Sequence, residues 1–330
     1  MNNPDMRFGS RDRLTLFCVV ALAVCLASRA TAEATERECL VAIVKSWDLP
    51  EYNTAIGGFL DTISQKRIKC KTVTYNLQGQ TEGGEQIVGK IRASKPDLIL
   101  TVGSRATEVM AKNFRSTPIV FSMVLYPVAS AFVANMDRPG ENVTGAAMDV
   151  PIERQLRVLL KIMPKLKRVG VLYSPDETLP VIEEAKRIAK SMNIQMIAEP
   201  VEAEGDVPDA LGRLDKQKIE ALWSVADGKV FTRPSTRYVI EYVLHRGIPF
   251  MGPHNGFVKA GALVALTADY RDNGRQAGEI AVQILNGAKP EGIAVGIPRK
   301  VEMALNLQVA GNIGLKIPQS IIDDAAQVFE

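Results

Sequence analysis

Short, continuous apolar runs alternate with helical stretches along most of this chain, and this alternation restricts the folds open to it. An apolar run at 97–102 is followed by helical spacing over 106–114. Apolar runs of this kind are typical of strands buried on both faces, and strand–helix repeats favour a parallel sheet covered by helices. A turn-rich stretch at 138–145 interrupts the alternation, which restarts before a strand at 168–173. The sequence therefore predicts an α/β fold with two doubly wound parallel-sheet lobes.

The late strands and helices are expected to complete both lobes, so the chain has to cross between them more than once. We expect one lobe to contain 33–148 and 268–298, and the other to contain 149–267 and 299–330. Within the second lobe, helical spacing predicts a helix that begins at Pro180. The hinge would consist of three crossover strands at 143–150, 266–270 and 298–303.

The first 32 residues have the three-part pattern of a secretory signal peptide. Three arginines precede an almost uninterrupted apolar run at 14–27, and Ala30-Thr31-Ala32 offers the small residues that a signal peptidase requires. A membrane anchor is the alternative, but the run is shorter than the ~20 apolar residues that a bilayer crossing needs. We therefore expect cleavage near Ala32 and a mature protein in the periplasm, where ATP and NAD(P)H are scarce.

A lipoprotein signal overlaps the first pattern. In Leu22-Ala23-Val24-Cys25, Cys25 would be the lipid acceptor. Val24 is bulkier than the small residue normally required before such a cysteine, so lipidation of Cys25 is the minority interpretation.

Two cysteines, Cys39 and Cys70, remain after the signal is removed. Each begins a predicted strand, and the two strands are joined by one helix, which makes them neighbours in a parallel sheet. An oxidising compartment favours a disulfide between two such residues. We expect a Cys39–Cys70 bridge; the alternative is a pair of buried free thiols.

The mature chain carries few of the residues on which catalytic and metal sites depend. Its histidines are His245 and His254, and it contains no Gly-x-Ser-x-Gly, P-loop or Gly-x-Gly-x-x-Gly motif. Loss of the signal removes four arginines and two aspartates, so the formal charge falls from +3 to +1. A nearly neutral protein has no electrostatic footprint for nucleic acid. We predict a binding protein with no catalytic residue, cofactor, metal or nucleic-acid partner.

Candidate ligand-binding residues follow the predicted strands, because ligands of open parallel sheets bind beyond the carboxyl ends of the strands. Ser104 opens a helix whose N–H groups suit a carboxylate, and Asp227 could accept hydrogen bonds from an ammonium group. Trp47, Tyr126 and Tyr173 could enclose an apolar or aromatic side chain. Each also has a structural alternative: a helix cap for Ser104, a cap or turn for Asp227, and core or rim packing for the aromatic residues.

Several segments share their order and spacing with one known family over nearly all of the mature chain. These segments are 95–104, 118–121, 142–145, 168–173, 261–263, 269–270, 274–277 and 306–318. On them, the chain resembles the substrate-binding proteins of ABC transporters, which have the type I periplasmic-binding-protein fold. The nearest branch is the one commonly linked to tryptophan and related amino acids.

The resemblance implies two lobes that close on a small ligand and present it to a membrane permease. In the family pattern, hydroxyl and backbone donors after the third and fourth strands surround a carboxylate. The matching residues of this chain are Ser104 and Ser122. The acid that meets the ligand's amino group would be Asp227.

The chain departs from the family pattern at places that bear on the ligand. Tyr126-Pro127-Val128 stands where relatives often carry Asp-Pro-Val, and Ala226-Asp227-Gly228 lacks the polar neighbours often seen beside that acid. Trp47 and His254 occupy positions that vary in the family, so we count both among the candidate ligand-binding residues.

These observations together predict a monomeric, periplasmic substrate-binding component of an ABC importer. Its ligand would be a small zwitterion, an apolar or aromatic amino acid. A sensory protein that docks on a receptor kinase or chemoreceptor would use the same lobes and is an alternative, as is a secreted enzyme on the same scaffold. A nucleobase, a short peptide or another small carboxylate are the alternative ligands.

Overall fold

The computed structural model describes residues 38–78 and 84–330. The predicted signal peptide, with Cys25 inside it, lies outside these residues. Within the described part of the chain, none of the helices has the length and apolar composition that a bilayer crossing needs.

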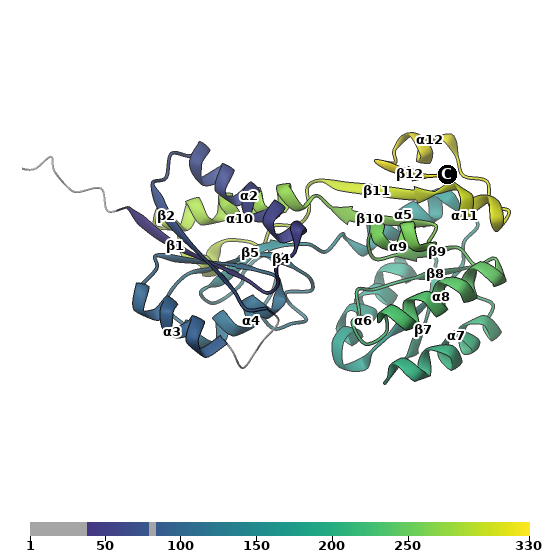
Figure 1. The fold of residues 1–330 in the computed structure, drawn as a ribbon. Coiled ribbons are helices and arrows are strands. Elements are labelled where there is room, and N and C mark those ends of the chain that lie inside the picture. The colour runs from purple at the N-terminus through teal and green to yellow at the C-terminus, as the bar shows by residue number, and fades with distance from the viewer. Residues whose placement is uncertain (1–37, 79–83) are drawn as a thin grey trace, which may run out of the picture. The chain divides into compact units, whose positions relative to one another are not determined.

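The first lobe is built on a five-stranded sheet with the order β2-β1-β3-β4-β5 (Figure 1). Its strands are β1 (Cys39–Lys45), β2 (Cys70–Asn76), β3 (Leu98–Val102), β4 (Ile119–Val124) and β5 (Val143–Ala147). The pairs β1–β3, β3–β4 and β4–β5 are parallel. Every residue of β3, β4 and β5 is buried, as expected for strands that are covered on both faces.

Helices cover both faces of this sheet. They are α2 (Pro50–Gln65), α3 (Gly84–Ser94), α4 (Ser104–Asn113) and α10 (Tyr270–Leu285), with a short 3₁₀ turn, η2 (Pro290–Gly292), near β5. Figure 1 shows α3 and α4 on one face and α2 with α10 on the other. Apolar residues of α3 and α4, among them Ile91 and Met110, form one core cluster with β1, β3 and β4.

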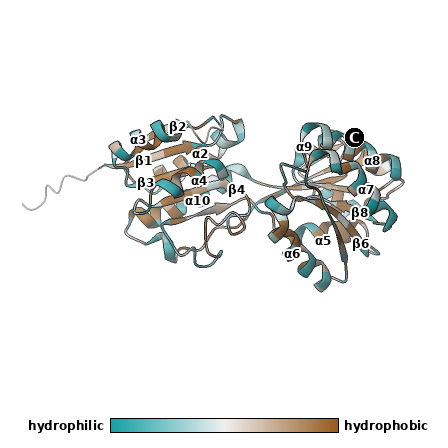
Figure 2. Ribbon diagram, turned by 90° about the horizontal axis from the view of Figure 1, so that it is seen from below, coloured by the Kyte–Doolittle hydropathy of each residue, from teal (hydrophilic) through white to brown (hydrophobic). Residues whose placement is uncertain are grey.

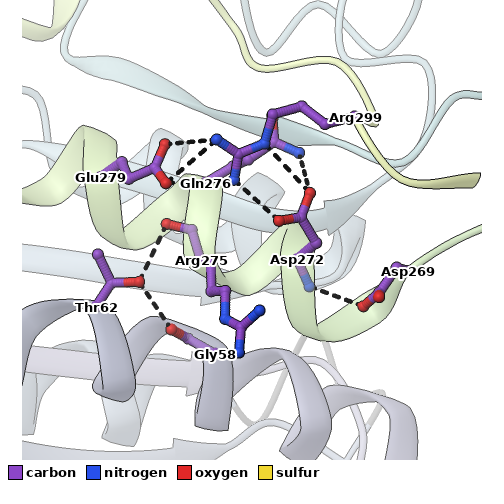
Figure 3. Close-up of polar contacts among 8 residues, drawn as sticks. All are labelled: Gly58, Thr62, Asp269, Asp272, Arg275, Gln276, Glu279 and Arg299. Carbon is purple, nitrogen blue, oxygen red and sulfur yellow. Dashed lines mark hydrogen bonds and ion pairs between the residues drawn. The ribbon is translucent and has the colours of Figure 1, made fainter. Parts of the chain in front are cut away.

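Glycines let α2 and α10 approach until their backbones touch. A Cβ atom added to Gly274 would lie 1.8 Å from the carbonyl oxygen of Ala55, and one added to Gly58 would lie 2.1 Å from that of Arg271. Thr62 of α2 also donates to the carbonyl oxygen of Arg275 in α10, at 3.5 Å (Figure 3). Because Gly58 and Gly274 have no Cβ atom, α2 and α10 can lie at this short distance from each other.

The second lobe is built on a seven-stranded sheet with the order β12-β11-β10-β9-β8-β6-β7. Its strands are β6 (Arg168–Tyr173), β7 (Gln195–Pro200), β8 (Ala221–Trp223), β9 (Phe250–Gly252), β10 (Val264–Ala268), β11 (Val301–Asn306) and β12 (Gln327–Phe329). The pairs are parallel except β10–β11, which is antiparallel. The predicted fold class, two lobes with parallel sheets, is thus confirmed.

Helices also cover both faces of the second sheet. They are α5 (Ile152–Ile162), α6 (Pro175–Ser191), α7 (Val207–Lys216), α8 (Arg233–Arg246), α9 (Asn255–Ala260), α11 (Leu307–Asn312) and α12 (Gln319–Asp323), with a 3₁₀ turn, η1 (Glu204–Asp206). Apolar residues of α5 and α6 share one core cluster with Trp223, whereas those of α7 and α8 pack with Phe250 in another. Hydrophobic residues accordingly gather on the strands and on the helix surfaces that face them (Figure 2).

The predicted elements agree with the structure in the sheet centres and differ at some ends. β6 has the predicted bounds, 168–173. The helix predicted from Pro180 begins at Pro175, because proline fits the first helical position, and Pro180 lies inside the helix. The stretch interpreted as a turn-rich link, 138–145, overlaps the start of β5, which pairs with β4 at the sheet edge.

Cys39 and Cys70 are disulfide-bonded, as the sequence predicts. They begin β1 and β2, which are neighbours in the first sheet. The bridge therefore ties the two strands together where both begin.

The chain passes between the two sheets after β5, after β10 and before β11. The last of these crossings is attached to α10 by Arg299 (Figure 3). The Arg299 guanidinium donates to Asp272 at 3.0 and 3.3 Å and to Glu279 at 3.0 Å. Asp272 is buried, and a buried carboxylate depends strongly on its cation.

Arg299→Ala should therefore lower the free energy of unfolding by about 3 kcal/mol, because the Asp272 carboxylate would stay buried without its cation. Urea unfolding measures this loss. Arg237→Ala is the matched control, since it removes an exposed ion pair with Glu241 and should cost less than about 1 kcal/mol. Equally small losses in the two variants would contradict the anchoring role of Arg299.

Candidate ligand-binding site

The strands of the first sheet direct their carboxyl ends to one edge, where several candidate residues follow them. Lys45 of β1 pairs with Val102 of β3, and Val102 pairs with Ser122 of β4. The segments that leave these strands therefore begin side by side. They carry Trp47, after β1, and Ser104, after β3, to the same edge.

The start of α4 at this edge has two unpaired backbone donors. The Ser46 hydroxyl accepts a hydrogen bond from the Ala106 N–H at 2.8 Å and so caps the helix in place of Ser104. Ser104 is exposed. Among the described residues, nothing accepts from the N–H groups of Ser104 and Arg105. A helix start with free N–H groups attracts an anion.

Two aromatic residues flank this helix start. The Tyr52 hydroxyl lies so close to Gly103 that a Cβ atom there would be 2.4 Å from it, and Gly103 has a φ of +91°. Burial raises the pKa of Tyr52, and its hydrogen bond with Ser46 acts in the opposite direction. Trp47 is 50% exposed, so much of its ring is free for a ligand. Glycine is thus required where the backbone turns beneath Tyr52.

Ser122 lies in a buried hydrogen-bond network that holds α10 on the sheet. Its hydroxyl donates to the Asn273 side-chain oxygen at 2.7 Å, and the Met123 N–H donates to the same oxygen at 2.9 Å. The Asn273 amide donates to the carbonyl oxygens of Ala146 and Ala147. Ser122 thus has a structural role, and its contact with a ligand carboxylate stays a prediction.

Tyr126 and Asp149 meet where the chain leaves β4 and β5. The Tyr126 N–H donates to both carboxylate oxygens of Asp149, at 2.8 and 3.0 Å, and Tyr126 has a left-handed φ of +52°. The Tyr126 hydroxyl accepts from the Ala226 N–H at 3.1 Å. Burial raises the pKa of Asp149 to about 7 and is also the main cause of a raised pKa at Tyr126.

Asp227 follows β8 of the second sheet. Both oxygens of its carboxylate accept hydrogen bonds from residues of its own lobe. One oxygen accepts from the Ser174 N–H at 2.7 Å and the Thr178 hydroxyl at 2.6 Å. The other accepts from the N–H groups of Lys229 and Val230, both at 3.0 Å. A carboxylate offers about four lone-pair positions. These bonds match the turn role left open by the sequence, and contact with a ligand ammonium group stays a prediction.

Asp227→Ala should lower the free energy of unfolding by about 2–4 kcal/mol, because buried donors at Ser174 and Val230 would lose their acceptor. Thermal unfolding of the ligand-free protein measures this. Asp176→Ala is the control, since it removes an exposed ion pair with Lys229 from the same region and should change stability by less than about 1 kcal/mol. A fully stable Asp227→Ala protein would argue against the turn role.

Tyr173 and His254 follow other strands of the second sheet. Tyr173 is the last residue of β6 and packs, partly buried, against the cluster around Trp223. His254 caps α9 by accepting from the Gly256 N–H at 3.1 Å, and its ring lies edge-on to Phe257 at 4.9 Å. Burial lowers the pKa of His254. Both are placed at strand ends, as expected.

Three residues near the carboxyl ends of the strands were not among the residues predicted from the sequence. Ser46 and Tyr52 shape the start of α4, and Asp149 receives the Tyr126 N–H. Ser46 and Asp149 each follow the end of a strand by one or two residues, which is the signal that could have identified them. Tyr52 lies in a helix, where nothing in the sequence marks its hydroxyl.

Comparison with known proteins assigns the family. The model of the ABC transporter substrate binding protein family matches residues 40–329. This chain belongs to that family. Its members are substrate-binding proteins rather than enzymes, which confirms the prediction of a non-enzymatic binding protein.

Three known proteins resemble this chain in sequence or in fold, and the names of two of them include an amino-acid ligand. A tyrosine-binding protein of Clostridioides difficile (strain R20291) is 26% identical over 263 residues, which cover 78% of this chain and 75% of that protein. An ABC domain from Streptococcus pneumonia in complex with L-Trp has a TM-score of 0.69 and 22% identity, covering 88% of this chain and all of that one. A ligand-free, open substrate-binding protein with adhesive properties from Clostridium difficile has a TM-score of 0.74 and 22% identity, covering 88% and 99%. The shared fold confirms the two-lobed architecture.

Proposed function

We propose that this protein is the substrate-binding component of an ABC importer and that it captures an apolar or aromatic amino acid. The observation that carries the proposal is the start of α4, where the unpaired N–H groups of Ser104 and Arg105 share an edge with the exposed Trp47 ring. The N–H groups suit a carboxylate, and the ring suits an apolar or aromatic side chain. The tyrosine and tryptophan named for two relatives support the same ligand class.

Capture would proceed by hinge closure. The chain crosses between the sheets three times, so the two lobes can move about these crossings while their own hydrogen bonds stay intact. A ligand that contacts both lobes favours the closed state by the free energy of the additional contacts. Tyr173 and His254 are the proposed contacts from the second lobe.

The signal-peptide pattern supports work in the periplasm, with an inner-membrane permease as partner. A monomer is sufficient for this role. A sensory protein docking on a receptor kinase would bind its ligand in the same way, and loss of amino-acid uptake on deletion of the gene would favour transport over sensing.

A thermal-shift screen tests the ligand class. The protein is unfolded and refolded to remove bound ligand, then tested with amino acids, nucleobases, sugars and small carboxylates. A ligand at a hundred times its Kd should stabilise the folded state by about 2.7 kcal/mol. A selective response to aromatic or branched amino acids is the expected result. A response only to ligands without an amino group would overturn the amino-acid assignment.

Two variants at one position test the carboxylate site. Ser104→Pro removes the N–H of the first helical residue, where proline is well accommodated, while Ser104→Ala removes only the hydroxyl. We expect Ser104→Pro to weaken amino-acid binding about 10- to 100-fold, the effect of one hydrogen bond to a charged group. Ser104→Ala should stay close to the wild type. Equal affinities in both variants would show that this N–H does not bind the ligand.

A further inference from the structure

We infer that Asp149 is the residue that receives the ammonium group of the ligand. This assignment rests on the proposed function, since it requires a ligand with an amino group. It adds a charged, specificity-determining contact to the first-lobe edge. That edge would then hold both ends of a zwitterion: the carboxylate at the start of α4 and the ammonium at Asp149.

The position of Asp149 fits this role. It lies two residues beyond the end of β5, and β3, β4 and β5 are adjacent and parallel. Asp149 therefore follows its strand to the same edge as Ser104. Asp149 is partly buried as a residue.

The charge of Asp149 is uncompensated within the described residues. No lysine, arginine or histidine pairs with it, and the Tyr126 N–H is shared between its two oxygens. The titratable groups beside it are the Tyr126 phenol and, further along that side chain, Asp227, neither of which is a cation. Burial accordingly holds the pKa of Asp149 near 7. A desolvated carboxylate without a cation is a favourable partner for an ammonium group.

Asp227, the other acid near Tyr126, is less suited to the role. Its four hydrogen bonds occupy both oxygens, whereas Asp149 has one backbone donor from another residue. The competing explanation for Asp149 is structural: it would hold Tyr126 in its left-handed conformation and favour the start of α5. The experiment has to separate these two roles.

Asp149→Asn separates them, because asparagine keeps an oxygen for the Tyr126 N–H and loses only the charge. Calorimetry at pH 8 would compare L-tryptophan and L-tyrosine with indole-3-propionate and 3-(4-hydroxyphenyl)propionate, which lack the amino group. We expect the variant to bind the amino acids at least about 30-fold more weakly, as for the loss of one partner of a buried charge pair. Binding of the propionates should change less than about 3-fold.

Asp227→Asn is the matched control. It should leave the ratio of amino-acid to propionate affinity unchanged, even where it lowers stability. A second readout is pH: wild-type affinity for the amino acids should fall about tenfold per pH unit below 7 as Asp149 takes up a proton, and Asp149→Asn should lose this dependence.

The outcomes are distinct. Equal weakening of amino acids and propionates in Asp149→Asn would assign Asp149 a structural role and overturn the inference. A selective loss in Asp227→Asn instead would transfer the role to that acid. Failure of the wild type to bind either amino acid, with another class of ligand bound, would overturn the proposed function and this assignment with it.

Discussion

The ligand-free Asp149→Asn protein should be more stable than the wild type at pH 8, by about 4 kcal/mol, and the difference should vanish near pH 4. In the folded protein burial raises the pKa of Asp149 to about 7, against 3.8 for the ordinary group. Between these values the folded state binds more protons than the unfolded state, so its stability falls as the pH rises. Each unit of difference is worth ~1.4 kcal/mol. The asparagine amide of the variant cannot ionise, so the variant does not lose stability in this way as the pH rises.

Urea unfolding of both proteins between pH 4 and 8 gives the difference between their free energies of unfolding. All other groups titrate alike in the two proteins, so their contributions cancel in this difference. Asp209→Asn, at an exposed position of α7, is the control and should show a difference close to zero at every pH. An Asp149→Asn protein that is less stable than the wild type at pH 8 would show that the charge supports the fold. A gain in stability with a loss of binding is the pattern expected of a residue kept for its function.

Gly274→Ala should destabilise the protein by about 2–4 kcal/mol. The new Cβ atom would lie 1.8 Å from the carbonyl oxygen of Ala55, a distance at which helices α2 and α10 have to separate. Helix propensity alone predicts the opposite sign, because alanine is about 1 kcal/mol better than glycine inside a helix. The sign of the change therefore reports directly on the packing of the two helices, and circular dichroism during thermal unfolding measures it.

Gly89→Ala is the matched control for this prediction. Gly89 lies in α3, where an added Cβ atom meets nothing within 4 Å, so the substitution should stabilise the protein by about 0.5–1 kcal/mol. A stabilising effect at both glycines would contradict the close contact between α2 and α10.

Local patterns made much of the fold predictable. A strand covered on both faces must be apolar at nearly every position, so β3 and β6 are visible in the sequence itself. Two strands joined by one helix become neighbours, which is enough to predict the bridge between Cys39 and Cys70. Element ends were less predictable: Pro175 and Pro180 are equally good helix starts by composition, and the structure uses the earlier one, where Thr178 of the first turn is buried and donates to Asp227.

By itself, the sequence determined a two-lobed α/β fold and predicted a signal peptide and candidate residues at the strand ends, because burial patterns and signal-peptide patterns are local features. Only the tertiary structure decided what those residues do. Asp227 and Asp149 are both acids that follow strands, and the difference between them comes from partners far along the chain. Asp227 receives the Ser174 N–H from 53 positions away, whereas Asp149 receives the Tyr126 N–H from 23 positions away and has no cation among the described residues. Hydrogen bonds of this range depend on how the strands are ordered in the sheets, which no local pattern encodes.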